Sequence, residues 1–533
     1  MFGGMQDWPL RIPRILDHAA REHSTRELVS LWADRSVTRT NWAGIKRDSL
    51  KLAQALERLG IGKGDRVATL AMNHSRHVVA WYGTIGMGGV IHTINPRLFD
   101  DQLVYIANHA EDRVLFYDRA FAPIVERLKP HWTSIEHYIC FDSAPGEHGF
   151  EDLIAAESGD YQWVEGDERD PAMLCYTSGT TGNPKGVLYE HRSTVLHAFA
   201  EVSRDVFDLS ARAVVLPIVP MFHAAAWGLP FATAMVGGKM VFSADYTPQV
   251  MCDLMRNEGV THSAGVPTVW LALMGYVDSS QADLGTLSLI HIGGAAAPRA
   301  MIEWFRNKGI RVGHAWGMTE MSPLGTSGAP LANWDSMSNE EQIAYSCMQG
   351  RVPFGVELRT MDDEGNVLPR DGRASGRLQA RGPWVIKQYY GDEGGPCVDA
   401  HGWFDTGDVA ILHANGAMQI TDRSKDVIKS GGEWISSIEL ENAAVGCPGV
   451  AEAAAVGVAH PKWDERPLLL VVRKAGAEVT VAQILEHLSK HVAKWWLPDE
   501  VLFVESLPHT ATGKLLKTAL REQYKDYRLE SAA

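Results

Sequence analysis

The 533-residue chain contains few cysteines, and their spacing points away from two kinds of site. The six cysteines are scattered along the sequence, and no two of them form a C-x-x-C pair. Structural zinc sites and disulfide frameworks usually show clustered or regularly spaced cysteines. The sequence therefore indicates neither of them. It favours a reducing compartment, so we expect the protein in the cytoplasm.

Long apolar runs and an excess of positive charge are also missing. No apolar run reaches the ~18 residues of a membrane-spanning segment, and the N-terminal residues lack the basic segment and apolar core of a signal peptide. The chain has 50 Lys and Arg residues against 65 Asp and Glu residues, which gives a net charge of −15. Because nucleic-acid binding depends on basic residues that neutralise phosphates, we expect no nucleic-acid partner and no membrane span.

What remains is the composition of a globular protein, with 45% hydrophobic and 22% charged residues. A chain of this length exceeds the size at which one hydrophobic core stops growing, so at least two domains are expected. Apolar residues recur every three or four positions over 12–60, which predicts helix there. The segment 329–348 is polar and poorly periodic, and we expect an irregular surface excursion. Alternation over 352–359 predicts a strand of a small β-rich subdomain.

Strand and helix patterns alternate in the first part of the chain. Apolar segments at 67–72, 90–94 and 114–117 have the length of buried strands, and 78–87 has helical spacing. Strands that alternate with helices form parallel sheets covered on both faces. The sequence therefore predicts an α/β fold.

The segment 176–187 reads YTSGTTGNPKGV and combines hydroxyl side chains, three glycines and one lysine. Glycines adopt positive φ freely, so consecutive N–H groups can turn toward an anion, and Lys185 adds a positive charge. It is not a Walker A loop, because Gly186 rather than Ser or Thr follows Lys185. Apolar residues on both sides predict a loop between two strands. An ordinary solvated turn is the alternative for any short Gly-Thr segment.

Further motifs follow this loop, and each alone has an ordinary interpretation as a packed turn or a surface loop. They are MFHAAAWG at 221–228, HIGGAAAP at 291–298, HAWGMTE at 314–320, GWFDTGD at 402–408, TDRSKD at 421–426 and PHTATGK at 508–514. Together and in this order, they resemble the motifs of the adenylate-forming superfamily, in its acyl-CoA synthetase branch. The resemblance covers residues 176–514, and the residues before it fit by their fold pattern.

The resemblance implies a site for ATP, with Mg²⁺ as a cofactor. The residues expected to bind the nucleotide are Thr177, Ser178, Gly179, Thr180, Thr181, Gly182 and Lys185 at the phosphates, Gly294, Ala295, Trp316 and Gly317 at the adenine, and Asp408 and Arg423 at the ribose or α-phosphate. Trp316 stands where relatives usually have Tyr or Phe. Thr319 would bond the α-phosphate, and Glu320 would hold Mg²⁺, a cation that prefers oxygen ligands.

Catalytic roles are also implied by the resemblance. Lys514 would be the catalytic lysine, acting with Glu320, Thr319 and His223. His509 replaces the Lys or Arg that usually begins the last motif.

The acyl group would lie against His223, Trp227, Val266, Gly293, Gly317 and Met318. Amino-acid-activating relatives have Asp at the position of His223, where it holds an ammonium group. A buried ammonium without a carboxylate partner would be costly, so His223 argues against an amino-acid substrate. Trp227 is bulky, which favours short or medium acyl chains or compact aryl acids.

The resemblance implies a large N-terminal domain at 1–422, built of α/β layered subdomains and a small β subdomain. A small mobile α+β lid would follow at 423–533, with its hinge at Lys425. Gly431 and Gly432 would line a tunnel for CoA.

The implied activity is that of an ATP-dependent acid–CoA ligase. A carboxylate and ATP would give acyl-AMP and pyrophosphate, and the CoA thiol would then give acyl-CoA and AMP. The N-terminal opening and the 329–348 segment are similar to those of medium-chain and 3-methylmercaptopropionate CoA ligases, which suggests such an acid as the substrate. An aryl-CoA ligase, an adenylating enzyme with another acceptor, and a homodimeric assembly all stay open.

Overall fold

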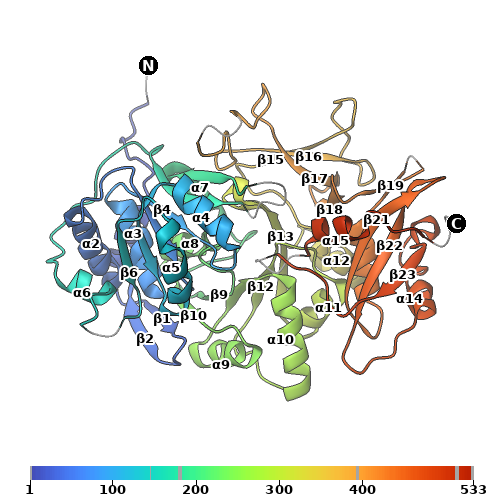
Figure 1. Ribbon diagram of the computed structural model, residues 1–533, viewed down its shortest axis with the longest axis horizontal. Helices are drawn as coiled ribbons and strands as arrows, with labels where there is room; N and C mark the ends of the chain where they lie inside the picture. Colours follow the sequence, from blue (N-terminus) through green and yellow to red (C-terminus); the bar gives the residue numbers. More distant parts are fainter. Residues whose placement is uncertain are drawn as a thin grey trace.

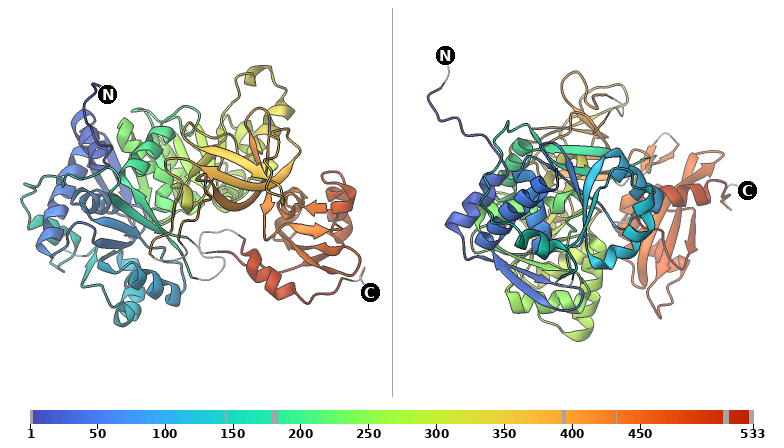
Figure 2. Two further views of the ribbon diagram at one scale, coloured as in Figure 1. Left: turned by 90° about the horizontal axis from the view of Figure 1, so that it is seen from above. Right: turned by 60° about the vertical axis from the view of Figure 1, so that its left-hand side comes forward.

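The computed structural model describes residues 3–143, 146–177, 183–391, 395–431, 433–510 and 515–529. Among these residues the strands form four sheets (Figure 1). Two large sheets and a small antiparallel sheet precede residue 424, and a fourth sheet lies in the C-terminal part. In Figures 1 and 2 the C-terminal part, in orange and red, lies at the opposite end of the molecule from the blue N-terminal helices. This arrangement agrees with the predicted α/β class and the smaller C-terminal α+β part.

The first large sheet has the strand order β6-β5-β3-β4-β7-β8. Its strands are β3 (Arg66–Leu70), β4 (Val90–Thr93), β5 (Asp112–Tyr117), β6 (His137–Cys140), β7 (Pro171–Tyr176) and β8 (Gly186–Glu190). All neighbours are parallel except β7 and β8, which are antiparallel. The strands predicted at 67–72, 90–94 and 114–117 are thereby confirmed.

The second large sheet has the strand order β14-β13-β12-β11-β9-β10-β1-β2. Its strands are β1 (Glu27–Leu31), β2 (Val37–Asn41), β9 (Val214–Pro217), β10 (Lys239–Ser243), β11 (His262–Gly265), β12 (Leu289–Ile292), β13 (Arg311–Gly317) and β14 (Leu324–Ser327). Only the two edge strands, β2 and β14, run antiparallel to their neighbours within this sheet.

The prediction of helix throughout 12–60 was wrong. The structure has α1 (Pro13–Glu22) and α2 (Trp42–Arg58), with β1 and β2 between them. Strand β1 pairs with β10, about two hundred residues later in the chain, and its Leu28 and Val29 are completely buried. Strand formation depends on such partners more than on local preference, so the local spacing was misleading.

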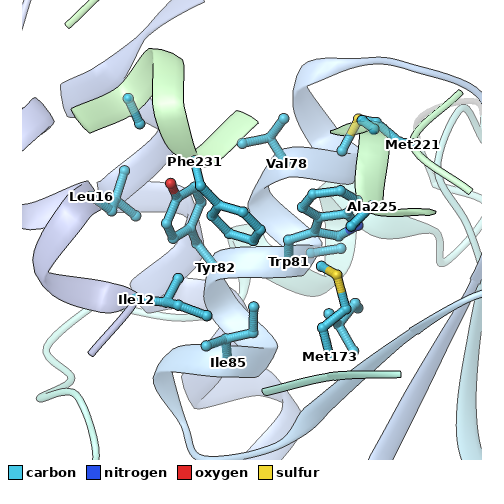
Figure 3. Close-up of a cluster of buried hydrophobic side chains, with 14 of the residues drawn as sticks. Ile12, Leu16, Val78, Trp81, Tyr82, Ile85, Met173, Met221, Ala225 and Phe231 are labelled. Carbon is cyan, nitrogen blue, oxygen red and sulfur yellow. The ribbon is translucent and has the colours of Figure 1, made fainter. Parts of the chain in front are cut away.

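Helices fill the space between the two large sheets. They are α1, α2, α3 (Ser75–Gly86), α7 (His191–Glu201) and α8 (Leu229–Val236), and they share one buried apolar cluster (Figure 3). Within it, the ring of Phe231 lies 5.4 Å from that of Trp81 and 5.7 Å from that of Tyr82. The cluster thus joins helices from distant parts of the sequence to both sheets.

Other helices cover the outer faces of these sheets. Side chains of α4 (Asp100–His109) and α5 (Ala122–Leu128) pack on the first sheet, and α6 (Phe150–Ala155) packs beside α2. Side chains of α9 (Pro248–Glu258), α10 (Pro267–Ser280) and α11 (Arg299–Asn307) pack on the second sheet. Both sheets are therefore covered on two faces, as the alternating pattern predicts.

The small sheet contains β15 (Glu357–Met361), β16 (Ser375–Arg381), β17 (Phe404–Leu412) and β18 (Met418–Arg423), all antiparallel. It confirms the small β subdomain, although β15 begins later than the strand predicted at 352–359. The segment 329–348 is not wholly irregular, because it contains α12 (Asn339–Ser346). Ser338 and Glu341 form a capping box at its start, and this signal was overlooked in the polar sequence.

The C-terminal part has its own sheet and apolar core. Its elements are β19 (Ile428–Ser430), β20 (Glu433–Ile435), β21 (Val450–His460), β22 (Asp464–Arg473), β23 (Glu500–Phe503), α13 (Ser437–Val445), α14 (Val481–Leu488) and α15 (Lys517–Tyr524). None of the helices in the described ranges is long and apolar enough to cross a membrane.

We expect Phe231→Ala to lower the free energy of unfolding by about 3–5 kcal/mol, because a large buried ring leaves a cavity when it is removed. Phe231 is 1% exposed between Trp81 and Tyr82. Urea unfolding followed by tryptophan fluorescence measures the change. The control is Phe199→Ala on α7, where the ring is 52% exposed. Equal effects of the two substitutions would contradict the assigned core.

Candidate active site

A cleft of about 960 Å³ brings most of the predicted site residues together. Those that line it are Thr177, Lys185, His223, Trp227, Val266, Gly293, Gly294, Ala295, Trp316, Gly317, Met318, Thr319, Glu320, Arg423 and Lys425. Several of them follow the carboxyl ends of the parallel strands β11, β12 and β13. Ligands of open α/β sheets bind in crevices at this edge.

The predicted phosphate loop connects β7 to β8, so the predicted loop between two strands is confirmed. Its two ends are held together by two hydrogen bonds. The Thr177 N–H donates to the Lys185 carbonyl over 2.9 Å, and the Lys185 N–H donates to Thr177 Oγ1 over 3.1 Å. Residues 178–182, which include the other predicted phosphate ligands, lie outside the described residues.

Glu320 lies at the polar end of the cleft and is 8% exposed. The Tyr389 hydroxyl donates to its Oε1 over 2.9 Å, and Lys185 Nζ lies 4.8 Å from the centre of the Tyr389 ring. Burial raises the pKa of the Glu320 carboxyl above its usual value. Tyr389 therefore connects the lysine of the loop to the carboxylate of a motif more than a hundred residues away.

The backbone beside Glu320 is held by Tyr189. The buried Tyr189 hydroxyl donates to the Thr319 carbonyl oxygen over 2.7 Å. Neither Tyr189 nor Tyr389 was identified from the sequence. Tyr189 is an ordinary strand residue of β8, and Tyr389 lies in no motif, so the sequence contains no signal for their contacts.

The residues at the polar end of the cleft fit a bound Mg²⁺ whose other ligands would be phosphate oxygens. Within the described ranges, no three His, Cys, Asp or Glu side chains form a metal cluster. Mg²⁺ commonly binds through one or two carboxylates together with substrate phosphates and water. Glu320 is such a single carboxylate, and a cation would offset the burial that raises its pKa.

Asp408 is buried beside the cleft with a donor on each oxygen. The Trp316 Nε1–H donates to Oδ2 over 2.8 Å, and Arg423 Nε lies 2.8 Å from Oδ1. A carboxylate offers about four lone-pair sites, so Asp408 retains capacity for a ligand. The indole N–H thus gives Trp316 a polar contact in addition to its ring face.

Two glycines create the space that this arrangement needs. A Cβ on Gly325 would lie 2.4 Å from the Trp316 ring, and a Cβ on Gly317 would lie 2.0 Å from the Pro323 carbonyl oxygen. Real Cβ atoms do not approach other atoms so closely. Glycine is therefore required at both positions for the present packing of Trp316.

A left-handed turn leads into the apolar end of the cleft. Residues Ala224–Gly228 all have positive φ, between 38° and 75°. A left-handed turn of L-residues is unfavourable by about 1–2 kcal/mol per residue, so the surrounding packing must hold it. An alanine-rich segment would be expected to form an ordinary right-handed helix, and the sequence gives no sign of this turn.

The turn places Trp227 across the apolar end of the cleft. A Cβ on Gly293 would lie 3.0 Å from Trp227 Cη2, so the ring tip lies directly against this glycine. His223, just before the turn, is half-buried and lines the same cleft. The indole is therefore part of the wall at this end, and its effect on the length of the acyl group stays a prediction.

A buried network lies beside the predicted hinge. Asp422 accepts hydrogen bonds from the Ser437 N–H over 2.6 Å and from the Ser437 hydroxyl over 2.7 Å. Lys517 Nζ donates to the same hydroxyl and lies 2.7 Å from Glu441 Oε1. These residues were not identified from the sequence, and they connect β18 to α13 and α15.

The remaining predicted residues are not all at the cleft. Gly431 is not among the residues that line it, and a Cβ there would lie 2.8 Å from the Trp463 ring. His509, Thr510, Leu515 and Leu516 do line the cleft. Gly432 and Lys514 lie outside the described residues, so their predicted roles stay predictions.

Comparisons with known proteins agree with this geometry. The family described as AMP-binding enzyme matches residues 16–390, and the AMP-binding enzyme C-terminal domain matches residues 439–514. The chain is 49% identical to the 3-methylmercaptopropionyl-CoA ligase of Ruegeria lacuscaerulensis over 99% of each chain. It is 44% identical to the medium-chain-fatty-acid–CoA ligase of Ectopseudomonas oleovorans over 100% of this chain and 99% of the relative.

Solved structures give the same result. The anthranilate CoA ligase AuaEII, in complex with anthranoyl-AMP, matches with a TM-score of 0.87 at 25% identity over 98% of this chain and 99% of that chain. The family match over residues 16–390 and the relatives at 44% and 49% identity along the whole chain show that this protein belongs to the AMP-binding enzyme family, in its acyl-CoA synthetase branch.

Proposed function

We propose that this acyl-CoA synthetase joins a short- or medium-chain carboxylic acid to CoA through an acyl-adenylate. The observation that carries the proposal is one cleft with a polar end at Lys185 and Glu320 and an apolar end at Trp227. Gly317, expected to contact both the nucleotide and the acyl group, lines the same cleft, which supports an approach of the acid to a nucleotide phosphate there. The names of two relatives, the 3-methylmercaptopropionyl-CoA ligase and the medium-chain-fatty-acid–CoA ligase, support an acid of this size, whereas a third at 44% identity is named a long-chain-fatty-acid–CoA ligase.

The chemistry explains why both ends are needed. A carboxylate is a poor acyl donor because its leaving group would be oxide. Attack of a carboxylate oxygen on the α-phosphorus of ATP forms an O–P bond and releases pyrophosphate, which leaves AMP as a good leaving group. The CoA sulfur then bonds to the acyl carbon, the thiol loses its proton, and AMP departs.

The polar end supplies contacts to ATP in this proposal. Lys185 and Thr177 contact phosphates, and Thr319 bonds the α-phosphate. Glu320 holds Mg²⁺, which neutralises phosphate charge when it is bound. Tyr389 keeps the Glu320 carboxylate in place through its hydroxyl.

The adenosine part of ATP lies further along the cleft. Trp316 offers its ring face to the adenine beside Gly294 and Ala295. Trp316 and Arg423 each contact one oxygen of Asp408. The remaining lone pairs of this carboxylate accept hydrogen bonds from the ribose hydroxyls. The Trp316 N–H therefore orients a carboxylate as well as carrying the ring.

The approach of one anion to another requires positive charge between them. We assign this role to Lys514, since His509 and Thr510 of its motif and Leu515, the residue after it, line the cleft. One positioned charge of this kind is typically worth ~3 kcal/mol in the transition state.

The second half-reaction requires another position of the C-terminal part. Gly431 is expected beside the CoA arm, but it is not among the residues that line the cleft in this structure. Rotation about Lys425 would bring it there, and the bonds of Asp422 to Ser437 would have to change or move with the lid. The hinge at Lys425 and the boundary at residue 422 belong to this proposal.

The experiment that tests the function measures AMP and thioester from Mg·ATP, CoA and a panel of acids. The panel contains acetate to dodecanoate, 3-methylmercaptopropionate, benzoate and cinnamate. We expect thioester with short- and medium-chain acids, because Trp227 narrows the apolar end. Preference for the aryl acids would identify an aryl-CoA ligase instead, and AMP without thioester would identify another acceptor than CoA.

Lys514→Ala is expected to abolish adenylation, measured as acid-dependent pyrophosphate release, because the repulsion between the two anions is no longer offset. Thioester formation from supplied acyl-adenylate should be much less affected. The control is Lys429→Ala, an exposed lysine that does not line the cleft. Equal loss of both half-reactions in Lys514→Ala would contradict the assigned role.

Trp316→Phe is expected to raise the KM for ATP about tenfold, since a hydrogen bond to a charged group is typically worth ~1.5–3 kcal/mol. The substitution keeps an aromatic face but removes the N–H that Asp408 accepts. A matched control is Trp304→Phe, which removes a similar bond to Asp278 Oδ1 of 2.9 Å on the surface. An unchanged KM in Trp316→Phe would show that this bond does not orient Asp408.

A further inference from the structure

Glu201, at the end of α7, is a buried carboxyl that lines the apolar end of the cleft. It is 1% exposed, and neither of its oxygens has a hydrogen-bond partner among the described residues. Buried polar groups in folded proteins nearly always have such a partner. An unpartnered carboxyl on the wall of a substrate cleft therefore needs an explanation.

The nearest titratable group does not satisfy it. His197 Nδ1 lies 3.5 Å from Glu201 Oε2, which is too long for a good hydrogen bond. His197 Nε2 accepts the Leu324 N–H over 3.1 Å, so the ring proton is on Nδ1. Burial lowers the pKa of His197 to about 3, and the ring is neutral at ordinary pH. The pair is therefore not an ion pair.

The surroundings of the Glu201 carboxyl favour its protonated form. Burial raises its pKa well above the usual value, and no cation lies near enough to oppose this within the described residues. A protonated carboxyl has one O–H donor in addition to its acceptor sites. Leaving such a donor unbonded in an apolar site is unfavourable, so a partner in the cleft would be stabilising.

The position of the carboxyl relates it to the acyl group. A Cβ on Gly228 would lie 2.3 Å from Glu201 Oε2, so the carboxyl packs directly on the residue that follows Trp227. Phe207, Ile218 and Leu324 also line the cleft and are apolar. Glu201 is thus a carboxyl on a wall that also contains apolar side chains, with His197 beside it.

We propose that Glu201 donates a hydrogen bond to an acceptor atom in the tail of the acid substrate. The site would then select ether or thioether acids over alkyl acids of the same length. This inference rests on the proposed ligase function and specifies its substrate class. An ether oxygen is the stronger acceptor and a thioether sulfur the weaker one, so both should depend on Glu201, the ether more strongly.

The test compares three acids of equal length: pentanoate, 3-methoxypropanoate and 3-(methylthio)propanoate. The measured quantity is kcat/KM for thioester formation, expressed relative to pentanoate. In Glu201→Leu, which has similar volume and no donor, we expect the relative value for the ether acid to fall about tenfold and that for the thioether acid about threefold. Glu201→Gln keeps a donor and should hold both values within about twofold of the unchanged protein.

A replacement variant and a control variant complete the test. If Glu201→Leu does not fold, Glu201→Met replaces it with the same expected fall. The control Phe207→Leu changes the apolar volume and should shift the preferred chain length while leaving the ether-to-alkyl ratio unchanged. Ratios that do not change in the apolar variants overturn the role of Glu201, whereas the absence of thioester with every acid overturns the proposed ligase function itself.

Discussion

Asp408 holds the polar end of the cleft together because a buried carboxylate must be paired. Its partners come from different parts of the fold, with Trp316 on β13 of a large sheet and Arg423 at the end of β18. Asp408 itself is on β17 of the small sheet. One carboxylate therefore links the small sheet to the large sheet and to Arg423, two residues before the hinge proposed at Lys425.

Much of the α/β framework could be predicted from the sequence. Strands β3, β4 and β5 are short apolar runs, and α3 between the first two has clear helical spacing, so local pattern and tertiary structure agree. Strand β1 could not be predicted, because its pairing with β10 is a long-range contact. Helix α12 begins with a capping box but has little apolar periodicity. The polar composition of the surrounding segment therefore outweighed the capping box in the prediction.

The motifs predicted which residues line the cleft, but they did not predict the hydrogen bonds that keep these residues in place. Thr177, Glu320 and Trp316 are recognisable because each belongs to an ordered motif. Tyr389 belongs to no motif, and Asp422 belongs to one that gave it no role; the contacts of both are hydrogen bonds to other parts of the chain. Glu201 was missed for the same reason, since a carboxylate at a helix end is usually solvated and its burial depends on how α7 meets the turn at Gly228.

The left-handed turn at Ala224–Gly228 affects how the shape of the apolar end of the cleft could change between related enzymes. Glycine and asparagine tolerate positive φ, whereas β-branched residues do so poorly. Substitutions at Ala225 and Ala226, which do not line the cleft, would therefore act on the path of the backbone and on the direction of Trp227. The position of Trp227 depends on backbone conformation as well as on side-chain size, so a substitution of Trp227 alone would leave the turn that positions residue 227 in place.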